Sequence, residues 1–457
     1  MSGLDPRTLS VAALARGLRD GGLSSEDVTR AFLDRIAAVN PKLNAVVRLR
    51  REEALTEARA ADRTPREGRR ALHGVPVTIK DSLDTAGVVT TGGTKGRAAF
   101  VPAEDATVVT RLRAAGAIVM GKTNTPDLTL SYETDNLVFG RTSNPYDVER
   151  TSGGSSGGAC AIVAAGGSPL DIGSDTGGSI RLPAHFCGIA GLKPTAGRVP
   201  RTGHILNYEG ACQFLTHIGP LARRVEDLAL VLGLIAGPDG VDPHVPPVPL
   251  GEAAAVGPAR LRVAYYTSLP PLECTPETAA AVDRAVAALA DAGGRTRAFG
   301  NVPDSHRVYE RYMSLLYGDG GAAVARALER WGTVESPLRE RLRAMTALTS
   351  GDLMALYEWL DQWRSRMLRL FADYDVIVCP VNAGPAPRHG SFDRATAAYT
   401  QVFNLTGWPS TVVRAGTSSE GLPIGVQVVA HPWREDVSLA AAGRIETALG
   451  PFPGPVL

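Results

Sequence analysis

The sequence predicts an α/β fold: a single large α/β/α sandwich in which helices flank a twisted, mixed and largely parallel sheet. Short apolar, β-rich runs alternate with helical patterns along the chain, as they do in βαβ units. The chain has 457 residues, 44% of them apolar, which is enough for one large core. The small, apolar run at 159–166 suits a helix packed close to a sheet. Strands are expected at 75–81, 117–120, 261–266, 376–379, 404–415 and 426–430.

Helix signals occupy much of the remaining sequence. Ser24 and Asp27 have the spacing of a capping box, which opens a helix over 25–39 with one apolar face. Thr275 and Pro276 supply a cap residue and a proline at the first helical position. Further helices are expected within 7–50, 42–62 (two helices), 108–115, 225–236, 276–292, 305–370 and 437–449.

Three segments are expected to lie outside regular elements. Residues 64–70 are basic and polar, which is typical of an exposed loop, and GKTNTP at 121–126 is interpreted as a turn. Residues 238–258 are rich in proline and glycine, which indicates an excursion over the surface.

Composition excludes several classes of function. The net charge of +1 gives no electrostatic basis for binding nucleic acid or an anionic membrane. No run of about 18 apolar residues is present, so no membrane span is expected. Residues 1–7 lack the apolar core of a signal peptide, and the five cysteines are odd in number with no CxxC pair. We therefore expect a cytoplasmic protein with reduced thiols; no metal-ligand spacing is found, and no cofactor is expected.

The chemistry is expected in one stretch, residues 151–195. It contains two glycine-flanked serine clusters, GGSSGG at 153–158 and DTGGS at 175–179. Glycine lets backbone N–H groups approach a ligand closely. A serine between such glycines can act as a nucleophile with hydrogen-bond donors already directed at its target.

The first hypothesis for these serines is a Ser-His-Asp hydrolase. Residues 153–157 and 154–158 both match the G-x-S-x-G pattern of a nucleophile elbow. The later histidines do not favour it, because none lies in a setting that singles it out as a base. These are His185, His204, His217, His244, His306, His389 and His431.

A lysine base is the better hypothesis. Lys80 ends the apolar run at 75–79, where burial would lower its pKa. A lysine at the end of a strand can equally point to solvent. Lys80 is therefore favoured as the base only because the two serine clusters are present.

Several separated motifs resemble those of the amidase signature family, and they occur in the order expected for that family. They cover most of the chain outside 236–375 and are GVPVTIKD (74–81), GKTNTP (121–126), GRTSNP (140–145), GGSSGG (153–158), GSDTGGSIRLP (173–183), CGIAGLKPT (187–195), residues 218–227, FNLTGWP (403–409) and GLPIGVQ (421–427). The resemblance implies one domain over 1–457 with a signature core at 70–235, a surface excursion at 236–260 and a variable helical insert at 300–375 that shapes the substrate pocket.

The resemblance also implies a Ser-cis-Ser-Lys triad. Position by position, the nucleophile falls on Ser179, the bridging serine on Ser155 after a cis peptide, and the base on Lys80. A serine hydroxyl is a weak nucleophile until a base takes its proton. The bridging serine would pass that proton to the lysine and later return it to the departing amine.

Further roles carried over from the family surround the triad. The oxyanion donors fall on the backbone N–H groups of Thr176, Gly177, Gly178 and Ser179. Ser156 matches an outer hydrogen-bond position, and Asp175 and Arg181 match positions that hold the loop. Thr129 matches a ligand contact of fatty acid amide hydrolases, which this region also resembles, and Ser131 and Tyr132 are expected in the acyl-side pocket.

The activity implied is hydrolysis of C–N bonds in linear amides through an acyl-enzyme. Some family members act on anilides, ureas or carbamates, so urethane hydrolysis and an esterase side activity are included in the expectation. The tryptophan-rich insert indicates a small apolar or aryl substrate, although its helices can also be ordinary core. The protein is expected to be a monomer or a homodimer.

Two alternatives remain. The A subunit of a tRNA-dependent amidotransferase shares this signature and would release ammonia from glutamine with the help of a partner protein. Residues 196–220 depart from that pattern, because they lack its tyrosine-glycine turn and its SLDQIGP sequence. A catalytically inactive, amidase-like binding protein is the other alternative, and the intact set of Lys80, Ser155 and Ser179 disfavours it.

Overall fold

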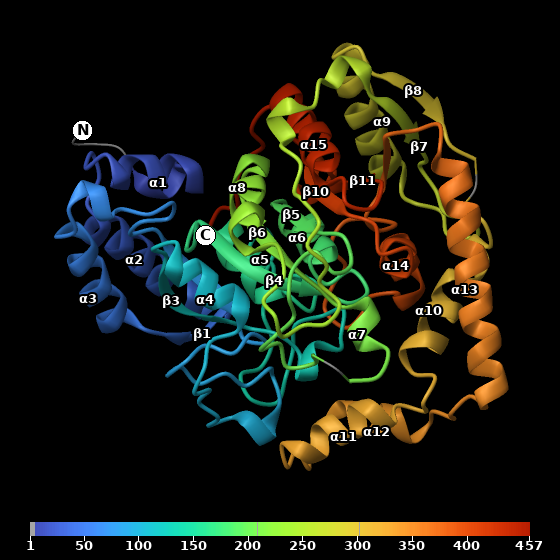
Figure 1. The fold of residues 1–457 in the computed structure, drawn as a ribbon, viewed down its shortest axis with the longest axis horizontal. Helices are drawn as coiled ribbons and strands as arrows, with labels where there is room; N and C mark the ends of the chain where they lie inside the picture. The colour runs from blue at the N-terminus through green and yellow to red at the C-terminus, as the bar shows by residue number, and fades with distance from the viewer. Residues whose placement is uncertain (1–4, 208, 301) are drawn as a thin grey trace.

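One large sheet runs through the molecule (Figure 1). The computed structural model describes residues 5–207, 209–300 and 302–457; expectations that touch residues 1–4, 208 and 301 lie outside the described residues. Among the described residues the sheet has 11 strands in the order β1-β3-β2-β4-β6-β5-β10-β11-β9-β7-β8. Helices flank this sheet, which confirms the predicted α/β class.

The strands come from all parts of the chain. Their bounds are β1 (Val46–Leu49), β2 (Pro76–Lys80), β3 (Ile118–Thr123), β4 (Leu170–Asp175), β5 (Ala190–Lys193), β6 (His217–Ala222), β7 (Arg262–Tyr265), β8 (Arg295–Ala298), β9 (Val376–Pro380), β10 (Ser410–Thr417) and β11 (Pro423–Ala430).

The sheet is mixed, but it is not largely parallel as expected. Parallel pairing joins β2 to β3 and β4, and β7 to β8 and β9. The remaining pairings are antiparallel, including the long β10–β11 hairpin. A buried strand is apolar on both faces in either direction, so its composition does not reveal its direction.

The helices vary from one turn to six. Their bounds are α1 (Val11–Arg19), α2 (Ser25–Leu43), α3 (Arg51–Asp62), α4 (Thr107–Ala114), α5 (Gly157–Ala164), α6 (Arg181–Cys187), α7 (Cys212–Leu215), α8 (Val225–Ile235), α9 (Pro276–Asp291), α10 (Val308–Leu316), α11 (Ala322–Arg330), α12 (Pro337–Arg343), α13 (Ser350–Phe371), α14 (Ala398–Leu405) and α15 (Glu435–Leu449).

Local cap chemistry sets several helix starts. The Ser24 side chain accepts a hydrogen bond from the N–H of Asp27 at the start of α2, and Thr275 caps α9 with Pro276 at its first position. Both starts were predicted from the sequence. Thr349 and Asp352 form a reciprocal capping box at the start of α13.

Three sequence-based assignments were wrong in part. The second of the two helices expected at 42–62 exists as α3, but β1 occupies the start of that range. The turn expected at 121–126 begins later, because β3 continues through Thr123. The strand expected at 404–415 starts only at Ser410, after α14. The first two errors fall on short segments whose pairing partners are distant in sequence, so local pattern could not decide them. The third error assigned the end of α14 and the residues that follow it to a strand.

The segments predicted to lie outside regular elements are largely as expected. Residues 64–70 are mostly exposed and contain one 3₁₀ turn. Residues 238–258 contain no α-helix or strand among the residues described there. This stretch is held to the body by guanidinium groups, since Arg111 donates to the Pro238 carbonyl and Arg198 to the Val248 carbonyl.

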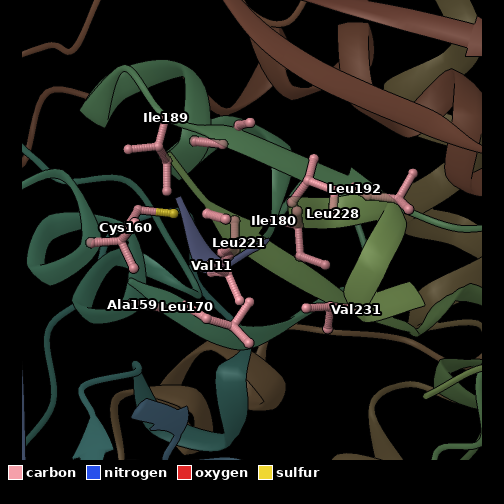
Figure 2. Close-up of a cluster of buried hydrophobic side chains, with 14 of the residues drawn as sticks. Val11, Ala159, Cys160, Leu170, Ile180, Ile189, Leu192, Leu221, Leu228 and Val231 are labelled. Atoms are coloured by element: carbon pink, nitrogen blue, oxygen red, sulfur yellow. The ribbon is translucent and has the colours of Figure 1, made fainter. Parts of the chain in front are cut away.

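The main core lies between the sheet and its helices. Figure 2 shows Cys160 of α5, Leu170 of β4, Leu221 of β6 and Leu228 of α8 meeting in one apolar cluster. All four are fully buried. This packing fixes α5 and β4, the two elements that hold the serine clusters, relative to each other.

A second apolar cluster surrounds the helices of residues 308–371. Trp363 is fully buried in it and stacks on Trp359, with ring centroids 5.7 Å apart. Figure 1 shows α13 running along one edge of the molecule, with α10 between α13 and α14. Trp363 is therefore a core residue, and the partly buried Trp359 packs against this core.

Gly158 allows α5 to approach the sheet closely. A Cβ atom there would lie 2.4 Å from the Asn124 backbone nitrogen and 2.7 Å from the Ala45 carbonyl oxygen. We predict that Gly158→Ala destabilises the protein by about 1–3 kcal/mol through overpacking. The control is Gly233→Ala in α8, where a Cβ meets nothing within 4 Å, and which should stabilise the helix by about 0.5–1 kcal/mol. Denaturant midpoints would test both, and equal effects would contradict the close approach.

Candidate active site

Lys80 is held at the end of an interior strand of the sheet. It ends β2, which lies between β3 and β4 and is parallel to both, so the carboxyl ends of three strands meet around it. Its side chain is fully buried. Ligand and active sites in α/β sheets form at this end of the strands.

Three serine hydroxyls surround the Lys80 ammonium group. Lys80 Nζ lies 2.7 Å from Ser155 Oγ, 3.0 Å from Ser156 Oγ and 2.9 Å from Ser174 Oγ. Ser174 is on β4, and the other two serines precede α5. The expected Lys80–Ser155 contact is thus present, and the contacts to Ser156 and Ser174 are additions.

The backbone before α5 has the shape expected for the bridging serine. The Gly154–Ser155 peptide bond is cis. Gly154 packs against the backbone of residues 131–133, where a Cβ atom would lie 2.8 Å from the Glu133 nitrogen. A glycine is therefore required at 154 by close approach.

Ser179 lies on the loop between β4 and α6, directly beside the first cluster. Its carbonyl oxygen accepts a hydrogen bond of 3.1 Å from the Ser156 N–H. Its hydroxyl lines a pocket and makes no hydrogen bond to another described residue, Ser155 included. The structure thus places the two serine clusters on adjacent backbone segments, with Ser179 lining the pocket.

Asp175 and Arg181 hold the Ser179 loop. The Asp175 carboxylate accepts from the N–H groups of Gly178 and Ile180 and from the Arg181 guanidinium at 2.9 Å. Both side chains are fully buried. Burial alone would raise the pKa of Asp175, but the Arg181 charge and its hydrogen bonds hold that pKa well below its usual range.

These hydrogen bonds remove one of the four backbone N–H groups that were expected as oxyanion donors. The Gly178 N–H is used by Asp175, so it is not free to bind a substrate oxygen. The N–H groups of Thr176, Gly177 and Ser179 have no acceptor within the described part of the chain. These three remain as candidate donors.

Burial changes the proton affinity of Lys80. Desolvation lowers its pKa to about 7, although the negative charges of Asp175 and Asp171 oppose the shift. Asp171, on β4, accepts hydrogen bonds from Thr78 and Thr123, and burial raises its own pKa to about 7. A large fraction of Lys80 is therefore uncharged near neutral pH.

His204 is a neighbour that the sequence did not single out. Its Nε2 lies 3.0 Å from Ser174 Oγ, and so His204 connects to Lys80 through Ser174. Burial and the Lys80 charge lower the pKa of His204 to about 3, so the imidazole is neutral. No histidine in the described residues bonds to Ser155, Ser156 or Ser179, which disfavours the Ser-His-Asp hypothesis.

A pocket opens over Ser179. Thr129, Ser131 and Tyr132, the three residues expected on the acyl side, all line it. Thr129 has a φ of 62°, in the left-handed region that non-glycine residues seldom adopt. The Tyr132 hydroxyl accepts a hydrogen bond from Gln401 at 2.7 Å.

The opposite wall comes from residues 308–343. Tyr309, Tyr312 and Met313 of α10 line the pocket, and Arg341 of α12 joins them. The Tyr312 hydroxyl donates to the Thr176 carbonyl oxygen at 3.0 Å, which fixes α10 against the Ser179 loop. The segment expected to shape the pocket thus contributes residues to it.

Comparison with known proteins places this arrangement in a family. The family model described as Amidase matches residues 27–439. The chain belongs to the amidase family. It is 38% identical to the putative amidase AmiB2 of Mycobacterium tuberculosis (strain ATCC 25618 / H37Rv), over 97% of this chain and 98% of that protein.

Two further relatives bear on the activity of this amidase-family chain. It is 35% identical to the A subunit of the glutamyl-tRNA(Gln) amidotransferase of Nitratidesulfovibrio vulgaris (strain DP4), over 98% of both. The solved structure of 6-aminohexanoate cyclic dimer hydrolase, complexed with substrate, superposes with a TM-score of 0.88 and 29% identity over 99% of each chain.

Two features are absent from the described part of this amidase-family chain. Across residues 5–207, 209–300 and 302–457, no group of three or more His, Cys, Asp or Glu side chains could hold a metal ion. No helix in these same ranges is both long and apolar enough to cross a bilayer.

Several pocket and site residues were missed by sequence reasoning. Ser174 lies inside a motif that was recognised, and its position one residue before Asp175 could have suggested a role. His204, Arg341 and Arg394 lie outside any quoted motif. No local signal marks them, because only the tertiary structure brings them to the site.

The buried Asp175–Arg181 pair predicts a stability effect. Arg181→Met leaves an unpaired carboxylate in the core and should destabilise this amidase by about 3–5 kcal/mol. The control is Arg30→Met, because the Arg30–Glu26 pair is largely exposed and such pairs contribute at most about 1 kcal/mol. Denaturant unfolding of both variants measures the difference, and similar losses would contradict the role of Arg181.

Proposed function

We propose that this amidase-family protein hydrolyses the C–N bond of small amides, anilides or carbamates through an acyl-enzyme on Ser179. The observation that carries the proposal is the buried Lys80, which contacts Ser155 at 2.7 Å and has a pKa lowered to about 7. A lysine in this state can accept a proton at neutral pH.

The first step forms the acyl-enzyme bond. Uncharged Lys80 takes the proton of Ser155, which in turn takes the proton of Ser179 as the Ser179 oxygen attacks the substrate carbonyl carbon. Catalytic hydrogen bonds are often longer in a free enzyme than in its substrate complex. The N–H groups of Thr176, Gly177 and Ser179 are free to stabilise the oxyanion, and one such donor typically contributes about 10²–10³ in rate.

The second step expels the amine. Ser155 donates a proton to the departing nitrogen and regains one from the Lys80 ammonium, while the C–N bond breaks and the Ser179 ester remains. Water then attacks this ester with the same relay acting as base. Every proton that Lys80 accepts is returned, so the cycle consumes only substrate and water.

The pocket supports an apolar or aryl acyl group. Tyr132, Tyr309 and Tyr312 present aromatic surface near Ser179, and Leu130 and Met313 add apolar surface. The similarity to 6-aminohexanoate cyclic dimer hydrolase supports an amide as the bond cleaved. The same site is expected to cleave esters and urethanes as side activities.

A second candidate is the A subunit of an amidotransferase, favoured by the 35% identity to such a protein. It predicts glutamine as substrate and a co-purifying partner protein. Turnover of anilides by the isolated chain, with no ammonia released from glutamine, would exclude it. An inactive binding protein would turn over none of these compounds.

Fluorophosphonate labelling tests the nucleophile. A fluorophosphonate probe should label the wild-type protein covalently, and Ser179→Ala should abolish both labelling and amide turnover, because no other group would attack. Ser419→Ala, in the exposed turn between β10 and β11, is the matched control and should behave as wild type. Labelling that persists in Ser179→Ala would remove Ser179 as the nucleophile.

The pH profile tests the base. Below pH 7 Lys80 is protonated and cannot accept a proton, so kcat/KM should rise about tenfold per pH unit and level off above a midpoint near 7. Lys80→Met keeps the length of the side chain and should lower kcat by several orders of magnitude, with the fold retained.

The neighbouring Asp171 provides the control for this profile. Its charge raises the pKa of Lys80, so Asp171→Asn should move the midpoint to lower pH. A profile that requires a protonated group instead, or near-normal turnover by Lys80→Met, would contradict the relay.

A further inference from the structure

Two guanidinium groups line the pocket that contains Ser179. Arg341 comes from α12, and Arg394 begins a 3₁₀ turn, Arg394–Ala397, just before α14. Arg341 is half-buried and Arg394 is exposed at the pocket opening. Neither arginine forms an ion pair or stacks on an aromatic ring with any described residue. Arg341 donates a hydrogen bond to the Leu130 carbonyl oxygen at 3.3 Å.

The pocket contains no carboxylate to balance these two charges. Its other lining residues are neutral. Outside the lining, Asp393 accepts from the Ala395 N–H and Glu133 from the Gly390 N–H. Asp127 accepts from the Ser336 hydroxyl, and although burial raises the pKa of Asp127, the Arg341 charge lowers it. The pocket therefore has a net positive charge beside the nucleophile.

The charges of both arginines act on one side chain of the pocket, Tyr317. Burial raises the pKa of Tyr317 to about 12, and the positive charges of Arg341 and Arg394 both oppose this shift. Tyr317 lines the pocket with them. An anion in this region could therefore interact with both guanidinium groups at once, while the aromatic wall holds the chain that carries it.

We propose that the substrate is an amide whose acyl chain ends in a carboxylate, bound by Arg341 and Arg394, with the scissile carbonyl at Ser179. This inference rests on the proposed function and specifies its substrate class. Guanidinium groups match the planar geometry of a carboxylate and can bind it bidentately. Placing the anion at the open end leaves the neutral amide at the buried end, where a charge would be costly.

Binding to an inactive variant tests the inference without turnover. Calorimetry of Ser179→Ala would compare the mono-anilide of glutaric acid with its terminal carboxamide, which has nearly the same shape and no charge. Charge-assisted hydrogen bonds predict about tenfold or tighter binding of the carboxylate. This preference should fall as salt is raised.

Arginine variants, made in the Ser179→Ala background, test whether Arg341 and Arg394 cause the preference for the carboxylate over the carboxamide. Arg341→Gln and Arg394→Gln should each reduce the ratio of the two affinities several-fold, and Arg→Lys at the same positions should retain part of it. Arg343→Gln is the matched control, since Arg343 is exposed on the same helix and does not line the pocket. Melting temperatures would verify that all variants fold.

Turnover measurements on the wild-type protein distinguish a failure of this inference from a failure of the proposed function. Succinyl, glutaryl and adipoyl 4-nitroanilides would be compared with their neutral carboxamide partners through kcat/KM, and one length should be preferred. Tight, arginine-dependent carboxylate binding without turnover would overturn the proposed function and would support only the carboxylate-binding part of this inference. Turnover or binding without charge preference, or no binding of any carboxylate, would overturn this inference.

Discussion

The burial of the Lys80 amine against serine hydroxyls is the interaction on which the rest of the site depends. An amine excluded from water loses its preference for the charged form, and three hydroxyls at 2.7–3.0 Å keep it hydrogen-bonded in either state. The sheet provides that environment, because β2 is covered by β3 and β4 on its edges and by α5 near its end. A surface lysine at the same distance from a serine would stay protonated and could not act as a base.

One part of the site, the Ser179 loop, is held in place by buried bonds. The facing wall has few contacts to that loop. The Ser179 loop is fixed by the Asp175–Arg181 pair and by its bond to Ser156, all of it buried. The facing wall comes from α10 and α12, whose residues are partly exposed and whose contacts to the loop are few, chiefly the Tyr312 hydrogen bond. This division keeps the reacting groups in place while the wall that meets the substrate carries the aromatic and cationic side chains.

Sequence reasoning predicted the elements whose signals are local. The strand that ends at Lys80, the caps of α2 and α9 and the helix after the first serine cluster all lie where patterns indicated. The Lys80–Ser155 contact and the cis peptide followed from the family resemblance, and the structure contains both. The direction of β5, β6 and β10, and the strand β1, were not predictable, because pairing between distant segments decides them. The loss of Gly178 as a donor follows from Asp175, whose side chain folds back on its own loop.

By itself, the sequence determined the family of this protein, the glycines that let two serine segments approach, and the strand that carries a lysine. The residue pattern alone did not show which lysine is chemically special, since Lys80, Lys122 and Lys193 are all fully buried, and only the family resemblance indicated Lys80. Only the tertiary structure showed that Ser174 contacts Lys80 and connects it to His204. It alone also showed that Arg341 and Arg394 share a pocket with Ser179. The physical reason is that pKa, burial and charge balance depend on neighbours in space, and these come from segments far apart in the chain.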